Sequence, residues 1–147
     1  MSSTGVRNVG IFIACAIVAL LGAMAFVRLA PVDAARWHVA QEARDLPPGA
    51  VTPEVGGAWL RLPSDAPADL LARLDAIAMA TPRTARLAGS VAEGRITWET
   101  RSALWGFPDY TTAELTPEGV VIHARLRFGR EDMGVNAARL AAWQAQL

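Results

Sequence analysis

An uncharged apolar run near the N-terminus limits what this chain can fold into more than any other feature. It covers residues 9–27 and is bracketed by Arg7 and Arg28. A helix of this length rises roughly 28 Å at about 1.5 Å per residue, which matches the hydrocarbon core of a bilayer. The run therefore predicts one transmembrane helix over residues 9–28, preceded by a short tail of residues 1–8.

Two other interpretations of this run stay open. A charged flank, an apolar stretch and the small residues Ala23 and Ala25 also fit a cleavable signal peptide, and a buried helix of a soluble protein is the third option. The stretch is long for a signal peptide, and Arg28 bounds it as charges bound a membrane anchor. We therefore expect a signal-anchor that is retained.

The orientation of the helix is not decided by the positive-inside rule. Arg7 and the amino terminus on one side are balanced by Arg28 and Arg36 on the other. The very short N-terminal tail favours export of the C-terminal part. We expect a single-pass protein of the cell inner membrane with a periplasmic domain, and the lipid bilayer as the partner of residues 9–28.

The length and charge of the chain limit the remainder. Of the 147 residues, about ninety are left after an anchor and a linker, enough for one small domain at residues 58–147. Fourteen basic and fourteen acidic residues balance, so no basic surface for nucleic acid is indicated. The Pro- and Gly-rich residues 29–57 predict an extended linker that holds the domain off the bilayer. Within it, Trp37 and His38 could lie at the membrane interface or pack on the domain.

The pattern of the domain predicts an α+β fold. Apolar residues at helical spacing follow Ser64, two hairpins are indicated at residues 84–104 and 110–128, and a last helix begins after Asp132 as its N-cap. The last strand alternates between an apolar and a charged face. We expect a small two-layer domain of a helix, two β-hairpins that form an antiparallel sheet, and a C-terminal helix, with both helices on the apolar face.

Three motifs occur in order: T-R-S at residues 100–102, G-F-P-D-Y at 106–110, and R-F-G-R-E-D-M-G-V-N at 127–136, followed by Arg139. With Pro82-Arg83-Thr84 and Leu87-Ala88-Gly89, they resemble the DUF1499 family of bacterial and plastid proteins of unknown function. The similarity spans roughly residues 74–143. It implies an association with membranes or with N-terminal export segments, and it implies no established activity.

The motif loops adjoin strand ends, so we expect their polar side chains to converge at one end of the sheet. These candidate ligand- or partner-binding residues are Arg101, Asp109, Tyr110, Arg127, Asp132, Asn136 and Arg139. Arginine forks beside a carboxylate, a phenol and an amide suit an anionic ligand such as a lipid headgroup or a carboxylate. The alternative is a buried Arg-Asp lattice that fixes the loops and caps the last helix.

Catalysis has weak support in the sequence. Known nucleophile, zinc-protease, phosphate-loop and dinucleotide motifs are missing, no metal-ligand cluster stands out, and Ser102 with His123 is the one conceivable nucleophile and base. We expect no cofactor and no catalytic residues. Our first hypothesis is a membrane-anchored, non-catalytic envelope protein, an interaction or assembly module whose charged sheet face and motif loops engage a membrane protein. Binding of an anionic small molecule or lipid headgroup is the alternative, followed by a hydrolase-like enzyme.

Overall fold

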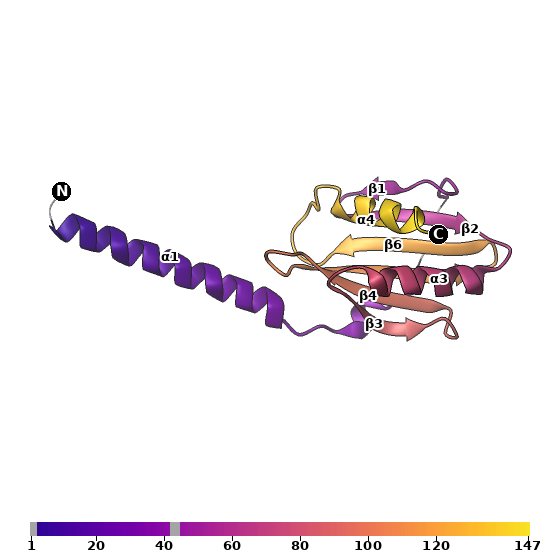
Figure 1. The fold of residues 1–147 in the computed structure, drawn as a ribbon, viewed down its shortest axis with the longest axis horizontal. Coiled ribbons are helices and arrows are strands. Elements are labelled where there is room, and N and C mark those ends of the chain that lie inside the picture. The colour runs from indigo at the N-terminus through magenta and orange to yellow at the C-terminus, as the bar shows by residue number, and fades with distance from the viewer. Residues whose placement is uncertain (1–2, 42–44) are drawn as a thin grey trace.

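The computed structural model describes residues 3–41 and 45–147. A long helix, α1 (Ser3–Leu29), projects from one end of a small domain (Figure 1). Its segment Gly5–Leu29 is long and apolar enough to cross a membrane: an 18-residue stretch of it has a mean hydropathy of 2.7 and is not buried in the protein, whereas Val27 near its end is buried. By length, composition and position near the N-terminus, α1 is a membrane anchor or a signal sequence.

The domain contains a six-stranded antiparallel sheet in the order β1-β2-β6-β5-β4-β3. The strands are β1 (Thr52–Glu54), β2 (Gly57–Pro63), β3 (Thr84–Ser90), β4 (Arg95–Arg101), β5 (Pro108–Thr116) and β6 (Gly119–Leu126). The two predicted hairpins are confirmed as β3–β4 and β5–β6. The sequence analysis missed β1 and β2, so the domain opens with a hairpin and not with a helix.

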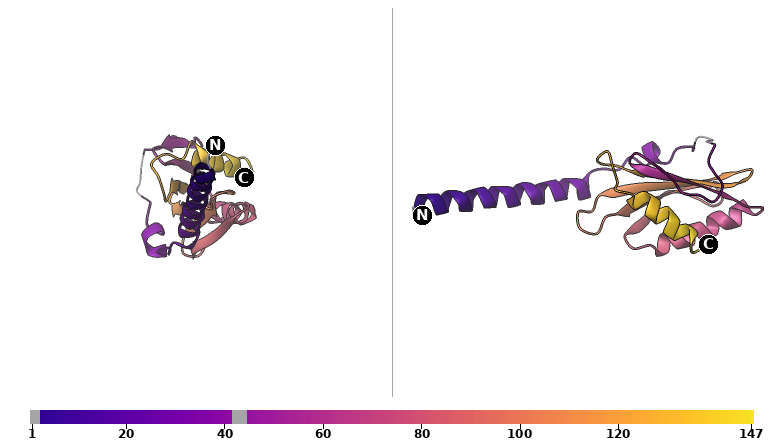
Figure 2. Two further views of the ribbon diagram at one scale, coloured as in Figure 1. Left: turned by 90° about the vertical axis from the view of Figure 1, so that its left-hand side faces the viewer. Right: turned by 90° about the horizontal axis from the view of Figure 1, so that it is seen from above.

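Two helices cover the apolar face of the sheet, as predicted. They are α3 (Pro67–Ala80) and α4 (Val135–Gln144), and both lie on the same side of the sheet in Figure 2. Leu71 and Leu74 from α3 and Trp143 from α4 pack with sheet residues such as Trp98 in one core, in which nearly every side chain is fully buried. The α+β fold class is confirmed, with burial of this apolar face as its main source of stability.

The other face of the sheet is covered by the chain itself. We call residues 30–41 the strap; it contains the short helix α2 (Ala34–Trp37) and crosses the polar face opposite α3 and α4 (Figure 2). The Trp37 ring stacks on Tyr110 with the ring centroids 4.1 Å apart. His38 Nδ1 lies 2.9 Å from Thr97 Oγ1. Trp37 and His38 therefore pack on the domain.

The range 29–57 thus differs from the extended linker that its prolines suggested. Besides the strap, Leu46 is buried against Trp59 and Val121 on the same polar face, and β1 pairs with β2 as an edge strand. An edge strand tolerates a proline such as Pro53 because one side of it needs no hydrogen-bond donors. Where the structure describes it, this proline-containing segment therefore packs on the domain.

The strand register defines two ends of the sheet. Gly57 pairs with Arg125, Arg101 with Pro108 and Asp109 with Leu126. The β1–β2 turn and the loops 102–107 and 127–134 therefore lie together at one end, from which α1 projects (Figure 1). We call this the α1 end. The turns 64–66, 91–94 and 117–118 lie at the opposite end, the distal end.

Candidate functional site

All seven residues singled out from the motifs lie at the α1 end, where they form two clusters. Asp109 and Tyr110 are consecutive residues of β5, so their side chains point to opposite faces of the sheet. Asp109 faces α4, and Tyr110 faces the strap. The sheet separates the two clusters, which therefore cannot act as a single ligand site.

The cluster on the helix side joins β5 to α4. Arg139 Nη2 lies 3.2 Å from Asp109 Oδ2, and Arg139 Nη1 donates to Asn136 Oδ1 at 2.6 Å. The Arg139 and Asp109 side chains are only 11% and 16% exposed. Burial raises the pKa of Asp109 above its usual range, and the charge of Arg139 opposes that rise. This is the lattice that the sequence offered as the structural alternative.

Asp132 belongs to the same cluster through the start of α4. The N-cap of this helix is Gly134 and not Asp132, yet the Asp132 carboxylate accepts the backbone N–H groups of Gly134 at 3.1 Å and of Asn136 at 2.8 Å. Burial disfavours the charged form, but these hydrogen bonds outweigh it, so the pKa of Asp132 lies below its ordinary value. The Asp132 side chain therefore caps the helix, although it lies two residues before the N-cap position.

The cluster on the strap side is organised around Glu99. Its carboxylate accepts from Arg101 Nε at 2.6 Å and from the Tyr110 hydroxyl at 3.2 Å. Arg127 lies 3.4 Å from the same hydroxyl and donates to the Pro31 carbonyl of the strap at 2.7 Å. Desolvation, with the nearby charge of Glu99, raises the pKa of Tyr110. This cluster attaches the segment that follows α1 to the sheet.

Glu99 was missing from the candidate residues of the sequence analysis. The available signal was its alternation with Thr97 and Arg101 on the charged face of β4. Its central position depends on the register Glu99↔Tyr110↔Arg125, which no local pattern gives. A cross-strand contact of this kind needs the pairing of three strands.

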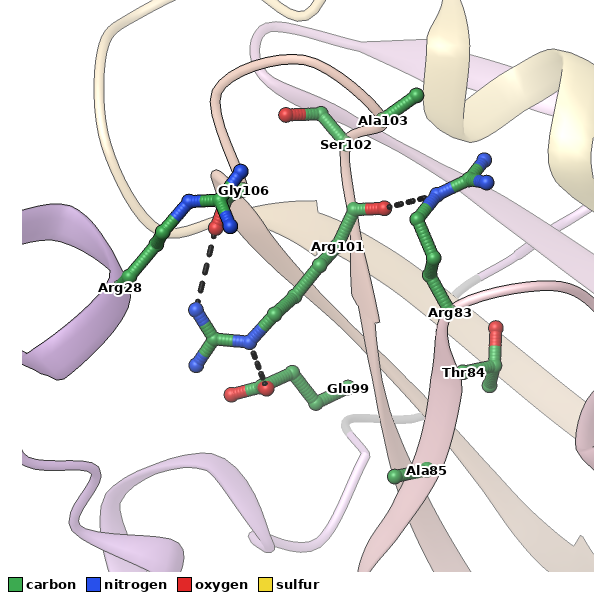
Figure 3. Close-up of a pocket in the computed structure, with 9 residues that line it drawn as sticks. All are labelled: Arg28, Arg83, Thr84, Ala85, Glu99, Arg101, Ser102, Ala103 and Gly106. Atoms are coloured by element: carbon green, nitrogen blue, oxygen red, sulfur yellow. Dashed lines mark hydrogen bonds and ion pairs between the residues drawn. The ribbon is translucent and has the colours of Figure 1, made fainter. Parts of the chain in front are cut away.

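A cavity of about 440 Å³ opens beside the strap-side cluster. It is lined by Arg28, Arg83, Thr84, Ala85, Glu99, Arg101, Ser102, Ala103 and Gly106. In Figure 3 the Arg28 and Arg101 side chains both reach toward Gly106, whereas the Arg83 side chain lies on the other side of the end of β4 and points away from them. Arg28 comes from the last turn of α1, so the cavity lies where this helix meets the domain.

The arginines of the cavity are held by backbone carbonyls. Arg28 Nη2 donates to the Leu104 carbonyl at 3.1 Å, and Arg83 Nε donates to the Arg101 carbonyl at 3.1 Å. Arg101 Nη1 donates to the Gly106 carbonyl at 3.1 Å. Within residues 3–41 and 45–147, neither Arg28 nor Arg83 forms an ion pair with a carboxylate. Each guanidinium donates to one backbone carbonyl, and its other N–H groups have no carboxylate partner among these residues.

Comparison with known proteins identifies the family. A family model described as a protein of unknown function (DUF1499) matches residues 32–147. The chain belongs to the DUF1499 family. No curated protein and no solved structure matches the chain. The matched range begins in the strap and is longer at both ends than the similarity noted from the motifs, whereas α1 lies outside it.

The DUF1499 domain does not bring Ser102 and His123 together. Ser102 Oγ accepts the Phe107 backbone N–H at 3.0 Å in the loop after β4. His123 lies mid-sheet, opposite Thr112 and in line with Thr97, five residues before Ser102. At about 3.3 Å per residue this separation is roughly 16 Å, too far for a base to reach a nucleophile. In the part of the chain that the structure describes, no His, Cys, Asp and Glu group could hold a metal ion.

Proposed function

We propose that this DUF1499 protein is a membrane-anchored binding module that holds a phosphate-bearing anionic group in the cavity lined by Arg28, Arg83 and Arg101. One observation carries the proposal: arginines from α1, from the turn before β3 and from β4 line a cavity whose one lining carboxylate, Glu99, is already bonded to Arg101 and Tyr110. The guanidinium groups of Arg28 and Arg83 therefore have charge and donors left for a ligand.

The position of the cavity favours a lipid headgroup as the source of this anion. Arg28 occupies the last turn of α1 and contacts Leu104 at the cavity edge. With α1 across a bilayer, the cavity lies at the depth of the lipid phosphates. A soluble phosphate ester carries the same recognition chemistry, and the experiment below separates these two sources.

An interaction or assembly role was our first hypothesis, and it assigned the charged sheet face and the motif loops to a partner protein. The strap occupies that face through Trp37, His38 and Gln41. A partner would have to displace these contacts to reach it. We therefore prefer the anion-binding role, for a domain that we propose to lie on the periplasmic side of the inner membrane.

A titration of the full-length chain tests the proposal. The detergent-solubilised protein is titrated with phosphatidylglycerol, and bound lipid is counted by native mass spectrometry. Because a charge-assisted hydrogen bond contributes about 1.5–3 kcal/mol, Arg83→Gln should raise the Kd about tenfold. Arg73→Gln is the matched control, since Arg73 is exposed on α3 and lies outside the cavity.

Inorganic phosphate separates the two sources of the anion. Competition by millimolar phosphate, with the same loss in Arg83→Gln, would indicate a soluble ligand. Lipid binding that phosphate does not displace would indicate a headgroup held together with its chains. Equal binding by the wild-type chain, Arg83→Gln and Arg73→Gln to both probes would refute the proposal.

A further inference from the structure

Exposed apolar side chains outside α1 gather at the α1 end of the domain. We call them the apolar rim: Val55, Leu104, Trp105, Phe107, Met133 and Val135. Val55 lies in the β1–β2 turn, and the others belong to the two motif loops and the first residue of α4. After residue 31, the other exposed large apolar side chains among the described residues are Val39 and Met79.

The exposure of these side chains is unusual for a small domain in water. Met133 is 95% exposed, Val55 83% and Leu104 68%, whereas the side chains of the core are almost completely buried. Contiguous exposed apolar groups generally mark a surface that contacts another molecule or a membrane. The turns at the distal end contain no exposed large apolar residue within the described segments 64–66, 91–94 and 117–118.

We propose that the apolar rim inserts into the interfacial layer of the same bilayer that α1 spans. Two contacts join the rim to the end of α1: Arg28 donates to the Leu104 carbonyl at 3.1 Å, and Arg127 donates to the Pro31 carbonyl at 2.7 Å. These bonds fix loop 102–107 and the start of loop 127–134 at the depth where α1 leaves the hydrocarbon core. The occupant of the rim is therefore the lipid that surrounds α1.

The charges around the rim suit this location. Arg28, Arg83, Arg127 and Arg130 lie at the α1 end together with the acidic Glu131 and Asp132, whereas the distal turns 64–66, 91–94 and 117–118 contain Asp65, Glu93 and Glu118 and no basic residue. Arginine side chains at the membrane surface are attracted by anionic headgroups, and tryptophans such as Trp105 are enriched at the interface. The exposed apolar side chains and these arginines thus lie at the end of the domain from which α1 projects (Figure 1).

Insertion of the rim gives the domain a fixed orientation on the membrane. An anchored domain on a free linker would tumble above the bilayer, whereas a domain held at α1, the strap and the rim cannot. This inference depends on α1 crossing the membrane and not on anion binding by the cavity. It is therefore tested in uncharged lipid, where the proposed function plays no part.

Site-specific fluorescence in nanodiscs tests the insertion. Cys15 is the sole cysteine, so Cys15→Ala provides a background for Leu104→Cys, Met133→Cys and the control Ala92→Cys. All three positions are exposed, and Ala92 lies in a distal turn. Each full-length variant is labelled with an environment-sensitive NBD group and reconstituted in phosphatidylcholine nanodiscs, which leave both membrane faces open to added quenchers.

We expect lipid-borne nitroxide to quench the labels at positions 104 and 133 and to leave the label at position 92 unaffected. Iodide in the buffer should quench position 92 several-fold more strongly than the other two. Iodide quenching of similar strength at all three positions would overturn the proposal. Protection of positions 104 and 133 from both quenchers would overturn it too, since a second copy of the chain would then cover the rim.

Discussion

The two ends of the sheet are built on opposite principles. At the α1 end, long loops expose apolar side chains and arginines, and buried charges such as Asp109 and Arg139 hold the backbone beneath them. At the distal end, the turns are short and polar, and the backbone at Gly119 lies against that of Leu62 and Pro63. Both ends belong to the same strands, so the difference lies in the loops and turns that connect these strands.

This contrast separates residues that keep the fold from residues that are free to contact something else. At the distal end, close backbone packing at Gly119 constrains the β5–β6 turn. The α1 end uses ion pairs and caps to hold loops whose outer side chains remain exposed. A loop that is rigid at its base and exposed at its tip is the usual arrangement of a binding surface.

The largest expected difference between the ends concerns their glycines. Gly119, the first residue of β6 next to the distal turn, has φ +145°, and a Cβ there would overlap the Leu62 carbonyl oxygen and lie 2.9 Å from Pro63 Cα. Gly129 in loop 127–134 has φ +99°, and a Cβ there would meet nothing within 4 Å. Backbone strain plus overpacking should make Gly119→Ala cost about 4 kcal/mol, and strain alone should make Gly129→Ala cost about 1 kcal/mol.

Denaturant unfolding of the two full-length variants in micelles measures these free energies. Gly119→Ala should yield little folded protein at 37 °C, whereas Gly129→Ala should fold. If Gly129→Ala proves the more damaging, loop 127–134 is packed more tightly than the structure shows, and the contrast between the ends is lost.

The second difference concerns ion pairs. Arg139→Ala leaves the mostly buried Asp109 carboxyl without its ion-pair partner, which should cost about 3 kcal/mol at pH 7. Arg61 pairs with Glu118 at the distal end at 3.2 Å, but the Glu118 side chain is 71% exposed. Arg61→Ala should therefore cost less than about 1 kcal/mol.

The pH dependence of the Arg139→Ala stability deficit distinguishes an unpaired buried charge from a simple loss of packing. The pKa of Asp109 is raised by burial, and removing Arg139 raises it further. Folded Arg139→Ala therefore takes up a proton on Asp109 more readily than the unfolded chain, and its deficit should shrink as the pH falls from 7 towards about 4. Adding Asp109→Asn should recover part of the stability at pH 7. A deficit that is constant with pH would assign the effect to packing.

Much of the fold could be predicted from the sequence because two patterns were strong. The apolar run of residues 9–27 and the alternation along β6 gave α1 and the two-faced sheet. What covers the polar face could not be predicted, since the strap binds through single contacts such as Trp37 on Tyr110, 73 positions apart along the chain. Its prolines and short length also carry no periodicity, so it resembled a linker.

The sequence predicted that the candidate residues lie at one end of the sheet, but not how they are arranged there. Their motifs adjoin strand ends, which placed them at one end of the sheet. Their division into two clusters follows from the adjacent Asp109 and Tyr110 on β5, and the role of Arg28 follows from the contact between α1 and Leu104. Such facts depend on strand register and on tertiary contact, which a single sequence does not contain.

The smallest expected difference concerns the carboxylate and the hydroxyl that bind backbone N–H groups at the two ends. Asp132→Ala removes two hydrogen-bond acceptors at the start of α4 and should lower the free energy of unfolding by about 1 kcal/mol at pH 7. Ser64→Ala removes one exposed acceptor, which binds the Ala66 N–H, and should lower it by about 0.5 kcal/mol. Because the pKa of folded Asp132 lies below its ordinary value, its contribution is complete above about pH 4 and is lost as the pH falls through the folded pKa. The deficit of Asp132→Ala, measured by denaturant unfolding, should therefore be constant from pH 7 to about pH 4 and decrease below it, while that of Ser64→Ala should not change. A deficit of Asp132→Ala that persists unchanged in acid would show that the side chain acts through its shape and not through its charge, and the cap at the α1 end would then resemble the one at the distal end.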